Sequence, residues 1–203
     1  HHRMQFISAT SEKQIPFIAI TGSNGKTTSK ELVHAVLSTA YKTYTTEGNL
    51  NNHIGIPLTI LKIKADAEIA IIEMGANHLK EIEEYCTYTM PTHGVITNCG
   101  KAHLEGFGSE EGIRKGKGEL FDYLKQNKGT AFIMSDYEYL QTMSSGIENI
   151  VTYGTHDADV TGIVKNSSGL LEVEITSDVM LNFIETKLVG EYNLPNILLA
   201  VTV

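Results

Sequence analysis

The sequence predicts an α/β fold: a parallel sheet that is flanked by helices and built around a P-loop, with a small antiparallel β appendage toward the C-terminal part. Short apolar runs recur with helical patterns between them, as buried parallel strands do. The first run leads through a glycine-rich turn into an amphipathic pattern. From residue 149 onward, short runs are separated by turns, and one of them alternates apolar with polar residues.

Composition narrows the class of protein. The chain has 203 residues, of which 41% are hydrophobic and 20% charged, so a globular domain is expected. The formal net charge of -8 argues against nucleic-acid binding, which needs clustered Lys and Arg. No apolar run reaches the length of a membrane span. The two cysteines, Cys86 and Cys99, lack ligand-like spacing, and we expect reduced thiols in a cytoplasmic protein.

The first strand, 17–20, is followed by Thr21-Gly22-Ser23-Asn24-Gly25-Lys26-Thr27-Thr28 and a helical pattern that continues to Ala40. Glycines at 22 and 25 let the backbone approach an anion, and the helix start near Lys26 directs N–H groups toward it. Lys26 would then lie beside the outer phosphates, with the Thr27 hydroxyl on magnesium.

This P-loop departs from the general pattern, which has glycine five residues before the Gly-Lys pair. That position is Ile20 here. The alternative is an ordinary glycine turn between a strand and a helix, but such a turn needs neither Lys26 nor two threonines after it. Because strand, turn and helix agree with one another, the sequence favours nucleotide binding.

An asparagine-rich loop follows the second predicted strand, 42–46. We name residues 47–57 the asparagine loop, since three of the four residues from Asn49 to Asn52 are asparagine. Asparagine favours side-chain to backbone bonding over regular structure, so we expect a loop of fixed shape. Pro57 suits the first turn of a short helix through Leu61. Composition alone leaves a surface loop and a ligand-facing loop equally open.

The third and fourth strands, 69–75 and 94–97, each lead into residues that could bind a ligand. Glu73 ends the third, where a magnesium contact or simple solvation is possible. A helix over 78–85 is expected to bury Leu79, Ile82 and Cys86. His103 lies in the loop expected over 101–108, after the fourth strand. A lone histidine is more often structural, but a place past a strand end makes a functional role more frequent than for histidines in general.

The helix predicted over 109–124 places a lysine among apolar side chains. With Ser109 as its cap, one face carries Ile113, Lys117, Leu120, Phe121 and Leu124, and the opposite face carries Lys115, Glu119 and Asp122. A lysine on the apolar face must snorkel, bind an anion or lose its proton, and a neutral amine could form a carbamate. The helical wheel alone favours snorkelling.

The remaining chain completes the predicted elements. A fifth strand spans 130–134, and residues 149–189 are expected to form the β appendage, packed on the parallel layer. Its strands are 150–153, 160–165, 170–176 and 181–188, with a hairpin turn at 166–169. Asn193-Leu194-Pro195-Asn196 caps a last helix. The helical pattern still continues at Val203, so we expect a piece of a longer protein.

Taken together, the motifs resemble the ATP-binding central domain of the Mur ligases over nearly the whole chain. Besides the P-loop, they are Gly48-Asn49-Leu50-Asn51-Asn52 with Ile54-Gly55-Ile56-Pro57, Glu73-Met74-Gly75-Ala76-Asn77-His78, Ala102-His103-Leu104-Glu105-Gly106-Phe107-Gly108-Ser109, Lys117-Gly118-Glu119 and Tyr192-Asn193-Leu194-Pro195-Asn196. The asparagine loop, the Gly-Ala-Asn-His run and the His-Leu-Glu-Gly-Phe-Gly run point to the branch that adds D-alanyl-D-alanine.

The resemblance implies ATP and two magnesium ions as cofactors, one ion held through a carbamylated Lys117, and it assigns roles to residues. Catalytic roles fall on Lys26, Lys117 and His103. Nucleotide binding falls on Gly22, Ser23, Asn24, Gly25, Lys26, Thr27, Thr28, Asn193 and Asn196. Magnesium binding falls on Thr27, Glu73, His103 and Lys117. Substrate binding falls on Asn49, Asn51, Asn52, Asn77 and His78.

The implied reaction joins D-alanyl-D-alanine to UDP-N-acetylmuramoyl-tripeptide through an acyl phosphate, in bacterial peptidoglycan precursor synthesis. The expected partners are these small molecules and ATP, with a monomeric chain and neither nucleic acid nor membrane. The family's N-terminal UDP-binding and C-terminal domains are expected outside this chain. Two alternatives remain: another ligase of this type, such as a folylpolyglutamate or cyanophycin synthetase, and a nucleotide-binding module without turnover.

Overall fold

The computed structural model of the protein describes residues 15–100 and 104–203. The strands in these ranges are β1 (Phe17–Thr21), β2 (Thr43–Thr45), β3 (Ile69–Glu73), β4 (His93–Ile96), β5 (Thr130–Met134), β6 (Asn149–Gly154), β7 (Val160–Asn166), β8 (Glu172–Ile175) and β9 (Phe183–Glu185). The helices are α2 (Lys26–Leu37), α3 (Gly55–Lys62), α4 (Glu81–Thr89), α5 (Leu104–Phe107), α6 (Glu110–Gln126), α7 (Glu138–Met143), the short 3-10 helix η1 (Glu191–Asn193) and α8 (Leu194–Thr202).

Within the described ranges, the strands form one hydrogen-bonded sheet of nine in the order β2-β3-β1-β4-β5-β6-β7-β8-β9. Neighbours from β2 to β7 pair in parallel, and β8 and β9 pair antiparallel. This arrangement confirms the predicted fold class. The P-loop follows β1. The ends of the neighbouring strands β3 and β4 lead into the other residues of the site.

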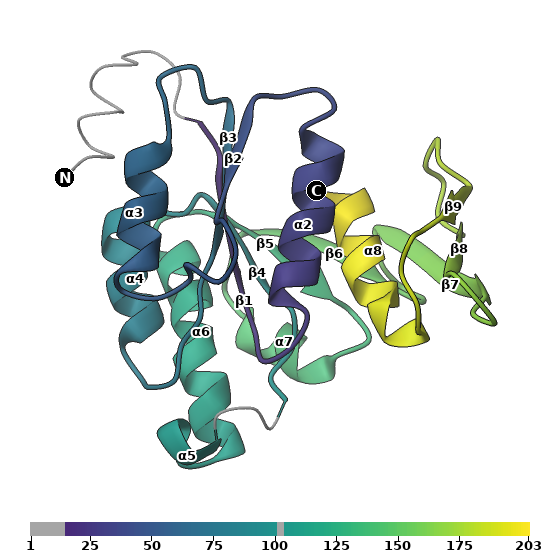
Figure 1. The fold of residues 1–203 in the computed structure, drawn as a ribbon. Coiled ribbons are helices and arrows are strands. Elements are labelled where there is room, and N and C mark those ends of the chain that lie inside the picture. Colours follow the sequence, from purple (N-terminus) through teal and green to yellow (C-terminus); the bar gives the residue numbers. More distant parts are fainter. Residues whose placement is uncertain (1–14, 101–103) are drawn as a thin grey trace.

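Helices cover both faces of the parallel part of the sheet (Figure 1). Helices α2 and α8 pack against each other on one face, and α4 and α6 pack together on the other. The central strands β1 and β3 are buried along their whole length, which explains their continuous apolar sequences. Because β1, β3, β4, β5 and β6 are parallel, their carboxyl ends lie at the same edge of the sheet.

The C-terminal β region differs from the expected appendage. Strand β6 pairs in parallel with β5 along its length, from Thr130↔Asn149 to Met134↔Tyr153, so the main sheet extends past residue 149. The unpredicted helix α7 provides the crossover that a parallel neighbour requires. Strands β7 to β9 then continue the same sheet edge to edge, rather than packing on its face.

Some side chains lie elsewhere than predicted. Ile82 and Cys86 are buried, but Leu79 is exposed, because α4 begins only after Lys80, whose φ of 74° breaks the helix. Glu119, predicted on the face opposite the apolar one, is buried, since α6 is covered by α4 as well as by the sheet. Residues Leu104 to Phe107, expected in a loop, form α5. Among the described residues, Cys86 and Cys99 are free thiols, as predicted.

Candidate nucleotide-binding site

The P-loop has the backbone shape that its glycines permit. Gly22 and Gly25 adopt φ of 144° and 80°, a region that disfavours side chains. A Cβ on Gly22 would lie 1.9 Å from the Thr97 hydroxyl, and one on Gly25 would lie 2.8 Å from Asn196 Oδ1. Both positions therefore require glycine. Helix α2 begins directly after Gly25, and no described side chain caps it, so its first N–H groups are available to an anion.

The residues after β4 hold the P-loop in this shape. Ser23 N donates to Asn98 O at 2.9 Å, and Asn24 N donates to Asn98 Oδ1 at 3.0 Å. In return, Thr97 Oγ1 and Asn98 Nδ2 donate to Asn24 O at 2.6 and 3.0 Å. The residues after β4 thus fix the loop before any ligand binds, which lowers the entropic cost of binding.

Lys26 and Thr27, which the sequence predicts beside phosphate and magnesium, make hydrogen bonds to the P-loop backbone and to the end of β3. Lys26 Nζ donates to Gly22 O at 2.8 Å and to Ser23 O at 3.2 Å, so the ammonium folds over the loop. Burial lowers the pKa of Lys26, and the nearby Glu73 carboxylate partly opposes this. Thr27 Oγ1 donates to Glu73 Oε1 at 3.3 Å. The end of β3 and the start of α2 therefore meet at the loop.

Lys117 is buried in α6, on the opposite face of the sheet from α2. Its side chain is fully shielded, and its Nζ has no hydrogen-bond partner among the described residues. Burial lowers its pKa to about 8, and the charge of Lys26 acts in the same direction. The snorkelling that the wheel favoured is therefore wrong: the amine stays inside, within electrostatic range of the P-loop lysine.

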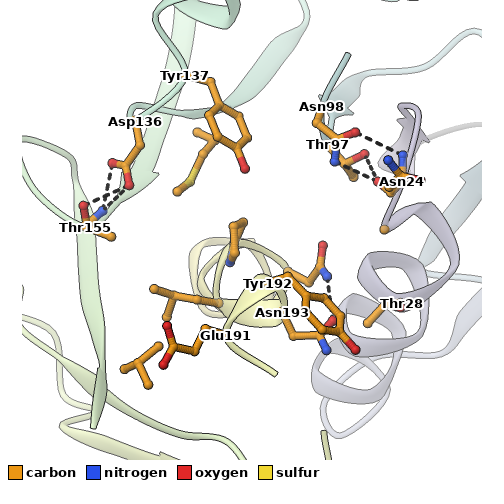
Figure 2. A pocket seen from close by; sticks show the side chains of 16 residues that line it. Asn24, Thr28, Thr97, Asn98, Asp136, Tyr137, Thr155, Glu191, Tyr192 and Asn193 are labelled. Carbon is orange, nitrogen blue, oxygen red and sulfur yellow. Dashed lines mark hydrogen bonds between the residues drawn. The ribbon is translucent and has the colours of Figure 1, made fainter. Parts of the chain in front are cut away.

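A large cavity of about 610 Å³ lies on one side of the P-loop (Figure 2). Thr28 and Asn24 line it from the loop side, and Asn193 and Asn196 line it from the start of α8. Both asparagines are buried and already bonded: Asn196 Nδ2 donates to Asn193 Oδ1 at 3.0 Å, and Ser29 Oγ donates to Asn196 Oδ1 at 2.9 Å. They form a rigid wall next to Gly25.

A small cavity of about 300 Å³ lies on the other side of the loop, lined by Lys26 and by residues after β3 and in the asparagine loop. It brings together three predicted substrate residues, Asn51, Asn52 and Asn77, with Glu81 and Tyr85 among the other lining residues. Glu81 Oε2 accepts from the N–H groups of Asn77 and His78 at 2.6 and 2.8 Å, which fixes this wall.

Two predicted substrate residues do not line either cavity. Asn49 and His78 are exposed. Asn52, which lines the small cavity, also stabilises the chain locally: its Oδ1 accepts hydrogen bonds from Ile54 N and Gly55 N at the start of α3. His103 lies outside the described residues. Within the part of the chain that the structure describes, no three His, Cys, Asp or Glu side chains cluster as a metal site would.

Sequence reasoning missed one wall of the large cavity. Asp136 follows β5 and Thr155 follows β6, and the Asp136 carboxylate accepts from the Thr155 amide at 3.0 Å and from its hydroxyl at 2.9 Å (Figure 2). Tyr137 lies beside them. The available signal was position, because each follows a buried parallel strand, where ligands gather.

The P-loop between two cavities, with a carboxylate at the end of β3, defines a P-loop nucleotide-binding domain of the α/β class. Residues 20–203 match the family model for the Mur ligase middle domain. The chain therefore belongs to the Mur ligase family, through its middle domain.

Individual relatives agree with this assignment. The chain is 37% identical over 185 residues to the UDP-N-acetylmuramoyl-tripeptide--D-alanyl-D-alanine ligase of Bacillus subtilis, covering 91% of this chain and 40% of that protein. A crystal structure of MurF from Acinetobacter baumannii superimposes with a TM-score of 0.87 at 28% identity, over 99% of this chain and 45% of that one.

MurF from Thermotoga maritima, solved in complex with ADP, superimposes with a TM-score of 0.82 at 27% identity, over 98% of this chain and 47% of that one. The chain thus spans less than half the length of each of these three relatives.

Proposed function

We propose that this chain is the ATP-binding middle domain of a bacterial, cytoplasmic ligase that joins D-alanyl-D-alanine to UDP-N-acetylmuramoyl-tripeptide. The observation that carries the proposal is the meeting of Lys26, Thr27 and Glu73 at one sheet edge between two cavities. The name of the Bacillus subtilis relative supports the choice of substrates.

The two cavities suggest where each substrate would bind. The large cavity, with Asn193 and Asn196 in its wall, would take the nucleoside of ATP. The P-loop residues from Gly22 to Thr28 would hold the phosphates. The small cavity, lined by Lys26, Asn51 and Asn77, would take the reacting ends of the other substrates. Asn49 and His78 are left as candidates for contacts farther from the reacting atoms.

The reaction would proceed in two steps. The terminal carboxylate of the tripeptide takes the γ-phosphoryl group of ATP, which gives an acyl phosphate and ADP. The amine of D-alanyl-D-alanine then attacks the acyl carbon, phosphate leaves with the carbon–oxygen bond electrons, and the amine loses a proton. Lys26 stabilises charge on the transferred phosphoryl oxygens, and the cavity walls position the two reactants.

The residues at the end of β3 fit a magnesium ion. Glu73 is buried, and its Oε2 has no hydrogen-bond partner among the described residues, which is costly unless a cation binds. Carboxylate and hydroxyl oxygens, here from Glu73 and Thr27, suit magnesium. When bound, the ion would neutralise charge on the phosphates. His103 is proposed as a further ligand from the family resemblance.

Lys117 fits the carbamate that the family resemblance implies. Carbon dioxide reacts with a neutral amine, and a lysine whose pKa is about 8 is partly neutral under mildly alkaline conditions. Its Nζ is buried without a hydrogen-bond partner in the described ranges. A carbamate there would turn a buried cation into an anion that can bind a second magnesium ion, within electrostatic range of Lys26.

The family's UDP-binding and C-terminal domains are proposed to lie outside this chain, which we expect to be monomeric. No helix in the described ranges is long and apolar enough to cross a bilayer.

Two measurements test the proposal. The 203-residue chain should bind MgADP in calorimetry but release no phosphate when ATP, the UDP-linked tripeptide and D-alanyl-D-alanine are all present. The whole protein should release phosphate only when all three are supplied. Release with folate and glutamate instead would identify a different ligase, and turnover by the chain alone would show that the other domains are dispensable.

A further inference from the structure

One side chain of the asparagine loop is bonded to the proposed magnesium ligand. Asn51 Nδ2 donates to Glu73 Oε1 at 2.8 Å, and Thr27 Oγ1 donates to the same oxygen at the longer distance of 3.3 Å. Glu73 is 1% exposed. Its other oxygen, Oε2, is buried with no hydrogen-bond partner among the described residues. The two carboxylate oxygens of Glu73 are therefore unequal.

The backbone holds Asn51 in this orientation. Asn51 O accepts from Gly75 N at 2.7 Å, and Asn51 N donates to Asn49 O at 2.8 Å. Gly75 leaves room for the amide, since a Cβ there would lie 2.8 Å from Asn51 Oδ1. With Oδ1 packed over Gly75, Nδ2 faces Glu73. The loop is anchored through its backbone, so the side-chain bond is not needed for anchoring.

We propose that Asn51 is a positioning residue for the magnesium-binding carboxylate. Its hydrogen bond occupies Oε1 and fixes the Glu73 side chain so that Oε2 is the oxygen offered to the cation. This inference rests on the proposed function, and it gives Asn51 a role different from the substrate contact that the sequence predicts. Partners that orient a metal ligand in this way change metal affinity by about 10- to 100-fold.

The position of Asn51 connects two parts of the site. The same residue lines the small cavity, beside Lys26 and Asn77. A change in the asparagine loop would therefore reach the cation through Glu73, without any contact between the loop and the nucleotide. The loop thus acts on the metal as well as forming a wall for the other substrates.

The test uses Asn51→Ala in the 203-residue chain, with Mn²⁺ and ADP as probes. Mn²⁺ binding to the ADP-bound protein is measured by electron paramagnetic resonance, and ADP affinity by calorimetry with EDTA and with Mn²⁺. We expect Mn²⁺ affinity to fall about tenfold or more, while ADP affinity in EDTA stays at the wild-type value. Asn51→Leu, which has the same branching and number of heavy atoms but no donor, should give the same result and covers the case that the alanine variant does not fold.

Asn127→Ala is the matched control, because it removes an asparagine amide that donates to Tyr123 O at 2.9 Å at the C-terminus of α6. It should leave Mn²⁺ affinity unchanged. Unchanged Mn²⁺ affinity in Asn51→Ala would overturn the inference, as would an equal loss of ADP affinity with and without metal, which indicates a general loop defect. A wild-type chain that binds neither ADP nor Mn²⁺ would instead contradict the proposed function.

Discussion

The ammonium nitrogen of Lys117 lies 5.5 Å from the centre of the Phe107 ring. A ring face attracts a cation, but it offers no oxygen to accept its protons, and no described group does so either. This contact compensates only partly for the water that Lys117 loses on folding. Burying the charged Lys117 side chain therefore costs free energy of folding. Raising the pH or modifying the amine would remove this cost.

The first prediction concerns stability and pH. The pKa of Lys117 falls from 10.5 to about 8 on folding. Between these values Lys117 binds more protons in the unfolded chain than in the folded one, so its own contribution to the free energy of unfolding should rise with pH from about 8 to 10.5. Below about 8 the buried charge costs on the order of 3 kcal/mol. Lys117→Met should remove this rise, as measured by urea unfolding in buffers free of carbon dioxide.

A second prediction concerns the carbamate. With ¹³C-labelled bicarbonate, the wild-type chain should show a carbamate carbon signal by NMR that grows as the pH rises through about 8, because only the neutral amine reacts. Lys117→Ala should lack the signal that belongs to Lys117, while any carbamate signal of the α-amino group remains. In the whole enzyme the same variant should lose activity, and added bicarbonate should not restore it. A wild-type rate in Lys117→Ala would remove Lys117 from the mechanism.

The third prediction concerns the glycines of the P-loop. Gly25→Ala places a Cβ at φ 80°, 2.8 Å from Asn196 Oδ1, and should cost about 1–2 kcal/mol of stability from the backbone alone. ADP affinity should fall as well, because the loop must shift. Gly169→Ala is the control, since a Cβ there meets nothing within 4 Å. Equal melting temperatures and ADP affinities for the two variants would contradict this account.

A fourth prediction concerns Glu119, whose carboxylate accepts from Lys80 N at 2.6 Å and from Glu83 N at 3.0 Å. Glu119→Ala should leave two N–H groups at the start of α4 without acceptors and cost about 1–3 kcal/mol. Hydrogen exchange should show faster exchange at these two amides. Asp122→Asn, on the exposed side of α6, should change neither. Unchanged exchange in Glu119→Ala would mean that other groups hold the helix start.

The sequence predicts best where the signal is local. The P-loop needs glycines at 22 and 25 for its own backbone, and Lys117 lies among buried residues because the spacing within α6 places it there. Glu119 could not be placed this way, since a helical wheel does not show that a second helix covers the other side of α6. Asp136 and Thr155 meet only because β5 and β6 are neighbours in the sheet. Such tertiary pairings depend on topology, which spacing along the chain does not contain.

The P-loop separates the two cavities, and Lys26 lines only the smaller one. A nucleoside in the larger cavity would be kept apart from whatever occupies the smaller one, with the phosphate chain passing between them. Selectivity for the nucleotide and selectivity for the other substrates would then be set by different residues. Substitutions after β3 and in the asparagine loop could then change which substrates bind in the smaller cavity, while the larger cavity for the nucleoside stays unchanged.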